Sequence, residues 1–187
     1  YTTLVRSTTM SEVQLFQQMA TYNQWMNGKV YEAAGRLDPS ELSRDRGAFF
    51  GSILGTLNHM VVGDTLWLKR FATLPSGTGT LQKVAAQPDP PSLDQILFDD
   101  LGRLWDHRRL LDGEIIRWAD GLKDSDVDQA LAYGTIEGRS SNKRLCHLIQ
   151  HFFNHQTHHR GQLSTLLSQA GEDIGVTDLW GLIPDET

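Results

Sequence analysis

The sequence predicts an all-α fold: a four-helix bundle with a longer crossover between the third and fourth helices. Four stretches of the chain carry apolar residues at intervals of three and four, the spacing of a helix that buries one face. They come with no sustained strand pattern and no internal repeat. A chain of 187 residues has room for one real core, so residues 1–187 are expected to form a single domain.

The first two helices are expected at about residues 12–37 and 45–74. Hydroxyl groups within residues 8–11 can cap the first helix, and Pro39 stops it because proline lacks a backbone N–H. The Gly, Pro, Thr and Gln residues that follow the second helix, at 76–91, predict the longest loop of the chain.

The third and fourth helices are separated by a segment without helical periodicity. Ser92 and Gln95 have the spacing of a capping box, which predicts that the third helix begins there, and Gly121 is a suitable terminator. Residues 124–141 lose the period and are expected to form a crossover with a short extended excursion. The fourth helix follows over about 141–169.

Composition limits the partners and the compartment. The net charge of -6, without a Lys/Arg cluster, excludes a phosphate-binding stripe, so no nucleic acid partner is expected. Cys146 is the one cysteine, which excludes a disulfide framework and a cysteine-rich zinc site. No apolar run reaches membrane-spanning length, and no signal peptide is evident. We expect a soluble cytoplasmic protein with no membrane partner.

Histidines gather in the fourth helix. Five of the seven lie between Leu145 and Leu167, and on a helix a spacing of four puts side chains on nearly the same face. Imidazoles one turn apart can grip one metal ion. The alternative is that these are satisfied core residues or a solvated flank. Four histidines recur every fourth residue, and the last two of them are nearest the apolar face: His147, His151, His155 and His159.

A metal of the zinc type needs at least one more protein ligand, and two histidines lie outside the fourth helix. His107 lies in the charged patch 105–109, which is expected to be a solvated face. His59 lies in the middle of the second helix, on a face with small residues that include Gly63. Small residues let another helix approach closely, so His59 is the better candidate, against the alternative of a histidine on a helix flank.

Three motifs in this chain resemble those of the DinB family, within the wider DinB/YfiT-like superfamily. They read YNQWMN at 22–27, SILGTLNH at 52–59 and NHQTHHRGQ at 154–162, and the resemblance extends over residues 12–171. It implies a four-helix bundle, usually dimeric, that binds one divalent metal through one histidine of the second helix and two of the fourth. Carried over to this chain, the metal ligands are those that spacing indicates: His59, His155 and His159.

Other residues are candidates for supporting roles. His151, Arg160 and Gln162 are expected around the metal or against a substrate, while the identity of any catalytic residue stays open. Trp25, Trp67 and Tyr133 are candidates to line a pocket, although aromatic residues on a helix face usually belong to the core. Imidazole ligands fit zinc or nickel best, with iron or manganese as alternatives.

The resemblance implies two hypotheses of different classes. In the first, the protein is a metal-dependent enzyme, a thiol-dependent S-transferase or a related hydrolase or isomerase. Its partners would be a small-molecule substrate and a low-molecular-weight thiol such as bacillithiol, mycothiol or glutathione. In the second, it is a damage-inducible stress-response protein whose metal is structural. Gln156 follows His155, so the His-Glu-x-x-His motif of metallopeptidases is absent and a peptidase is disfavoured.

Overall fold

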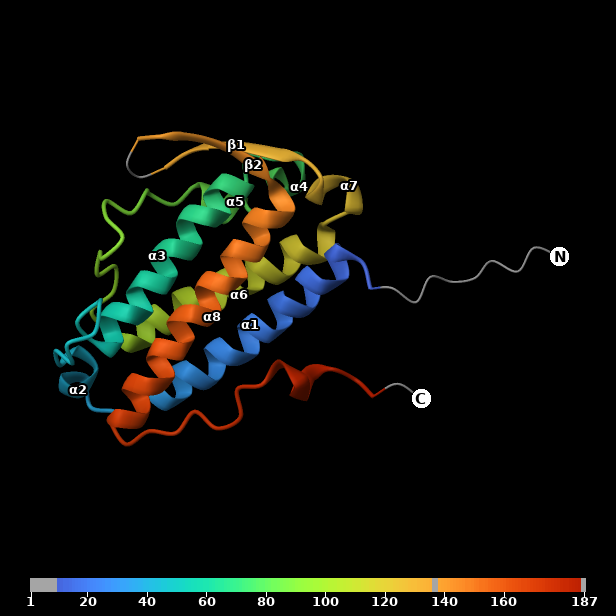
Figure 1. The fold of residues 1–187 in the computed structure, drawn as a ribbon. Helices are drawn as coiled ribbons and strands as arrows, with labels where there is room; N and C mark the ends of the chain where they lie inside the picture. Colours follow the sequence, from blue (N-terminus) through green and yellow to red (C-terminus); the bar gives the residue numbers. More distant parts are fainter. Residues whose placement is uncertain (1–9, 136–137, 186–187) are drawn as a thin grey trace.

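The structure is a computed structural model that describes residues 10–135 and 138–185. It is built on four long helices, α1 (Glu12–Ala34), α3 (Ile53–Phe71), α6 (Leu101–Gly121) and α8 (Leu145–Gln169) (Figure 1). The predicted all-α fold is confirmed, with one two-stranded sheet added to it in the part of the chain described. Two of the proposed capping hydroxyls, Thr8 and Thr9, lie outside the described residues.

Each long helix packs against two others. Helix α1 contacts α6 and α8, and α3 contacts the same two helices. In Figure 1, α1 and α8 run in one direction while α3 and α6 run in the other. Helices α3 and α8 are therefore neighbours, and side chains from the two can meet between them.

The apolar side chains of these four helices fill the space among them. Ring stacking between Phe71 of α3 and Trp118 of α6, with centroids 4.8 Å apart, joins two helices at the core. Phe152 of α8 meets the edge of Phe71 at 5.9 Å. The largest apolar side chains with under 2% exposure come from all four helices and one connection: Tyr31, Ile53, Leu57, Met60, Leu68, Phe71, Leu81, Leu104, Leu111, Trp118 and Phe152.

Side-chain caps fix the starts of α1 and α3. Ser11 and Gln14 form a capping box at α1, and Ser52 accepts from Gly55 N at 2.9 Å to cap α3. Helix α3 starts later than predicted because residues 45–52 form a tight loop instead. Gly51 in that loop has φ +72°, a conformation that favours glycine, and its N–H donates to the carbonyl of Ala48.

The predicted start of the third helix at Ser92 is wrong. The Ser92 hydroxyl bonds Asp94 instead of a helix N–H, and Asp100 caps α6 by accepting from Arg103 N at 2.9 Å. Residues 97 and 98 are held outside a helix because the buried amide of Asn58 accepts both of their N–H groups. The connection between the second and third long helices, 72–100, is consequently longer than the crossover between the third and fourth, 122–144.

Short elements occupy the connections and the tail. Between the long helices lie α2 (Pro39–Ser43), α4 (Pro75–Thr78), α5 (Gln82–Ala85) and α7 (Asp124–Val127). The extended excursion predicted in the crossover is a hairpin: β1 (Ala130–Gly134) pairs antiparallel with β2 (Ser140–Arg144), with Tyr133 opposite Ser141. Ile136, one of the residues proposed for it, lies outside the described residues. A 3-10 turn, η1 (Leu179–Leu182), lies in the C-terminal tail.

A buried ionic network crosses the middle of the helices, and it corrects the view of 105–109 as a solvated face. Arg108 is 1% exposed and lies 2.5 Å from Asp64 of α3 and 3.0 Å from Asp112 of α6. Burial acts to lower the pKa of Arg108, but the two carboxylates outweigh it and raise the pKa above its usual value. The guanidinium is therefore a permanent charge in the core.

The network extends to the remaining two helices through amides. Asn27 of α1 donates to Asp112 at 2.9 Å, and Gln156 of α8 donates to Asp64. Arg160 of α8 donates to Asn23 and Asn27. Two arginines and two aspartates thus balance in charge, and their contacts fix the four helices relative to one another.

Within the described residues, every helix is too short or too polar to span a bilayer.

Replacing Arg108 by Met tests the network. The substitution leaves Asp64 and Asp112 buried without a cation, and we expect the free energy of unfolding to fall by about 3–5 kcal/mol. Urea denaturation followed by circular dichroism measures this. Arg109→Met is the matched control, because that neighbouring side chain is 61% exposed and should shift stability by no more than about 0.5 kcal/mol. Equal effects of the two substitutions would contradict the assignment.

Candidate metal centre

Three histidines from two helices meet at one point between α3 and α8. The Nε2 atom of His59 lies 3.2 Å from that of His155 and 3.1 Å from that of His159, and the last two are 3.1 Å apart. His155 and His159 are one helical turn apart on α8, as the spacing predicted. The structure therefore brings together the three residues expected to bind the metal.

In two of these rings, the hydrogen-bond partner of Nδ1, which points away from the cluster, determines whether Nε2, which points into it, carries a proton. His59 Nδ1 lies 2.8 Å from the carbonyl oxygen of Leu93, which only accepts, so Nδ1 holds the proton. His159 Nδ1 likewise donates to Gln162 Oε1 at 2.8 Å. In the neutral rings Nε2 then carries a lone pair, and these lone pairs converge. Lone pairs at such distances repel one another unless a cation lies between them.

The spacing of the nitrogens fits a metal ion of the zinc type. Imidazole nitrogens bind such an ion at about 2.0–2.1 Å, which at tetrahedral angles separates two of them by about 3.3–3.4 Å. The three separations here, 3.1–3.2 Å, are close to that value. The oriented Nδ1 atoms match the second contacts that metal-bound histidines make in proteins. A divalent metal fits the residues present.

The protonation of the cluster suits a metal as well. Burial, together with the smaller effect of the neighbouring histidines, lowers the pKa of His155 from 6.5 to about 3. Burial also lowers the pKa of His159 to about 4, against the hydrogen bond to Gln162, and it lowers that of His59. All three rings are neutral near pH 7, which is the form that binds a metal.

Gly63 allows the two helices to come close enough for the cluster. A Cβ at this position would lie 2.9 Å from Cε1 of His155, a distance that real Cβ atoms almost never show. Gly63 is one turn beyond His59 on the same face of α3. Gly63, one of the small residues on the His59 face, therefore admits the side chain of His155.

Phe50, in the loop before α3, covers one side of the cluster. Its ring stacks on that of His59 with centroids 3.7 Å apart, and it meets the edge of His159 at 5.6 Å. Phe50 and the carbonyl of Leu93 were not predicted as part of the site, because both residues were expected inside helices, at 45–74 and from Ser92 on, whereas both lie in connections. The Phe49-Phe50 pair just before the capping residue Ser52 was the one available hint.

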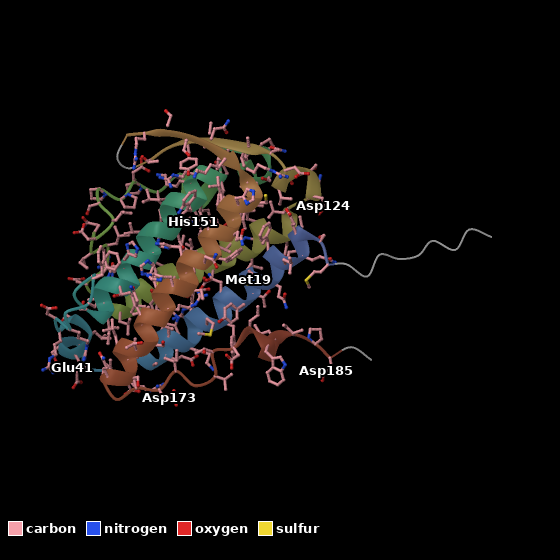
Figure 2. All side chains as sticks on the ribbon, viewed as in Figure 1. Met19, Glu41, Asp124, His151, Asp173 and Asp185 are labelled. Carbon is pink, nitrogen blue, oxygen red and sulfur yellow. The ribbon has the colours of Figure 1, made fainter. Side chains whose placement is uncertain are left out.

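A cleft of about 420 Å³ lies on another side and reaches His59 and His155. Two of the aromatic residues proposed for a pocket, Trp67 and Tyr133, line it, whereas Trp25 lies beside Tyr22 and Lys29 instead. His151 also lines the cleft, on the side of α8 that faces α3 (Figure 2). Its ring is 5.1 Å from that of Trp67, and it does not join the cluster.

The other two supporting candidates lie in different places. Gln162 is a partner of a cluster ring, through His159 Nδ1. Arg160 is 3% exposed and turned into the core, where Asn23, Asn27 and Thr157 hold it. It does not line the cleft.

Gly63→Ala tests the close approach of the helices. The added methyl group displaces His155, so zinc affinity should fall at least about tenfold, measured by competition with a chromogenic chelator. The metal-free protein should keep its melting temperature, because Ala favours a helix. Gly28→Ala in α1 is the control, since its Cβ meets no atom within 4 Å. Unchanged zinc affinity in Gly63→Ala would show that the cluster does not bind metal as arranged here.

Acid should destabilise the metal-free protein through His155. The pKa of His155 is about 3 in the folded protein, below the value of 6.5 in the unfolded chain. Between these two pH values the unfolded chain binds more protons, so the free energy of unfolding decreases as the pH is lowered. Urea titrations at about pH 7, 6 and 5 should show this decline, with a shallower slope in His155→Asn. Parallel slopes for both proteins would mean that His155 is not buried in its neutral form.

Comparisons with known proteins agree with the geometry. A model of the DinB family matches residues 8–185. Protein DinB of Bacillus subtilis (strain 168) is 24% identical over 159 residues, which cover 84% of this chain and 87% of that protein. No solved structure matches the chain significantly. Because the family model covers nearly the whole sequence, and the resemblance in three motifs already indicated it, the chain belongs to the DinB family.

Proposed function

We propose that this protein binds one divalent metal through His59, His155 and His159 and uses it in a metal-dependent reaction, as a thiol-dependent S-transferase or a related hydrolase or isomerase. The observation that carries the proposal is the converging triangle of Nε2 atoms beside a cleft. Zinc or nickel suits three imidazoles best, with iron or manganese as alternatives. The partners would be a small-molecule substrate and a low-molecular-weight thiol.

The ligand set supports chemistry over purely structural binding. Structural zinc sites are normally closed by four protein ligands, whereas catalytic sites keep three and leave one position for water or substrate. In the part of the chain described, three histidines form the cluster and no carboxylate or thiol joins them. When bound, such a metal lowers the pKa of a coordinated thiol or water and so supplies the nucleophile.

The surrounding side chains support the same role. Phe50 excludes water from one face of His59, and the carbonyl of Leu93 and the amide of Gln162 keep two rings in the tautomer that binds metal. Gln156, at the position next to His155, is held by Asp64 in the core. A helix-borne carboxylate base is therefore missing at that position, and a peptidase remains disfavoured.

The second candidate function is a non-catalytic stress-response protein with a structural metal. One observation favours it: the ligands come from α3 and α8, so an ion joins two helices and stabilises the folded state by binding it alone. For either function we propose a cytoplasmic homodimer, without nucleic acid or membrane partners, in line with the resemblance and the acidic composition.

One experiment tests both candidates. Zinc- and nickel-loaded protein is incubated with bacillithiol, mycothiol or glutathione and the generic electrophile monochlorobimane. Fluorescent adduct should form faster than in the protein-free control, and His59→Ala should abolish this gain because it removes a ligand from α3. His147→Ala is the control, since this exposed histidine lies outside the cluster.

Elemental analysis of the same samples separates the outcomes. About one metal ion per chain, lost in His59→Ala, together with thiol-dependent turnover supports the enzyme. The same metal content with no turnover for any thiol, and a melting temperature that falls sharply on chelation, supports the structural role. Wild-type protein that binds none of zinc, nickel, iron and manganese would exclude both.

A further inference from the structure

The cleft beside the histidine cluster is elongated along α3. One stripe of this helix forms its floor, because His59, Gly63, Leu66, Trp67 and Arg70 recur at intervals of three and four. The sides come from other elements: His151 and His155 of α8, Leu93 of the 72–100 connection, and Tyr133 and Thr135 at the hairpin. A ligand in this cleft would therefore lie along α3, with one end at the cluster.

The two ends of the cleft differ in chemistry. The cluster end offers the candidate metal. At the other end lies Arg70, and among the described residues that line the cleft it is the one with a full charge. Between the ends lie Gly63, Leu66, Trp67 and Tyr133, which are small, apolar or aromatic, and His151, whose ring is 5.1 Å from that of Trp67. A ligand that fits this sequence of surfaces has a metal-binding head, a slender apolar middle and an anionic end.

Arg70 is held in a defined position at its end of the cleft. Its guanidinium lies 4.6 Å from the centroid of the Trp67 ring and 4.9 Å from that of Tyr133, and it donates to the carbonyl oxygen of Gly134 at 3.2 Å. A guanidinium has five N–H donors in a planar fork that matches a carboxylate, so an anion can join the contacts that already hold it.

We propose that this cleft selects ligands whose carboxylate binds Arg70 while the other end binds the metal. The inference rests on the proposed function and names the class of molecule that the site takes: a thiol or other metal ligand with a carboxylate at a set distance. His59 and Trp67 are eight residues apart, about 12 Å along a helix, and the guanidinium of Arg70 folds back over Trp67. Part of this length is taken up by the bond from the ligand to the metal and by its contact with the guanidinium. A ligand that spans the cleft therefore has its two ends about 8 Å apart.

Two matched pairs of thiols test the proposal on the cobalt-loaded protein. 6-Mercaptohexanoate spans the cleft, while 6-mercaptohexanol has the same length without the charge. 3-Mercaptopropanoate and 3-mercaptopropanol form the short pair, which cannot reach from metal to Arg70. Binding is read from the thiolate-to-cobalt absorption band. We expect the long acid to bind about tenfold more tightly than the long alcohol, and the short pair to bind alike.

Arg70→Gln should remove the advantage of the long acid and leave the affinity of the long alcohol unchanged. Lys69→Gln is the matched control. It removes the same charge at the neighbouring position, and the Lys69 side chain does not line the cleft. Arg70→Lys should restore part of the preference. The proposal is overturned if the long acid and alcohol bind equally in the wild type, or if Arg70→Gln weakens both alike.

A second metal-binding head separates this inference from the thiol chemistry. Adipic acid monohydroxamate carries a carboxylate opposite its hydroxamate, and its primary amide lacks that charge; the d–d spectrum of the cobalt reports their binding. If thiols fail to bind but the hydroxamate acid is preferred and Arg70→Gln removes that preference, the thiol function is wrong and the anionic subsite stands. If neither head reaches the metal, the cleft does not serve the cluster and the proposal fails.

Discussion

A ring carbon of His155 occupies the space that a side chain at position 63 would need, so α8 places this ring directly against the backbone of α3. The other features of the site depend on that approach. The three Nε2 atoms converge because the helices lie near enough for His59 to reach the pair on α8. The same approach places Gln156, the next residue of α8, against Asp64, the next residue of α3. The contact at Gly63 and the ionic network in the core are therefore neighbours along both helices.

That arrangement keeps the acidic side chains of the core apart from the histidine cluster. The buried carboxylates Asp64 of α3 and Asp112 of α6 are already bound to Arg108. Their charge is balanced inside the core, so the cluster is left with neutral imidazoles alone. A divalent ion on neutral ligands keeps its full charge, and in a partly buried site that charge is weakly screened. Such an ion attracts anionic fourth ligands, of which a thiolate is one.

The features that follow from a periodic sequence pattern were predicted from the sequence. His155 and His159 were predicted by their spacing, and His59 by the small residues on its helix face. Arg108 was misjudged because its neighbours are charged, and a local charged patch does not show that Asp64, 44 residues earlier, turns toward it. The predicted helix start at Ser92 was wrong for a similar reason. The amide of Asn58 binds the backbone of residues 97 and 98, and this contact overrides the local capping pattern.

Those two failures have a common cause that also bears on function. A long-range polar contact overrode a local preference in each case, and each contact supports the cluster from a different side. The ionic network fixes α8 from within the core, while Asn58 holds the connection whose Leu93 carbonyl orients His59. Leu93 also forms a side of the cleft. The same contacts therefore hold the connection that lines the cleft and orient the ring of His59, so a substitution at Asn58 should alter both.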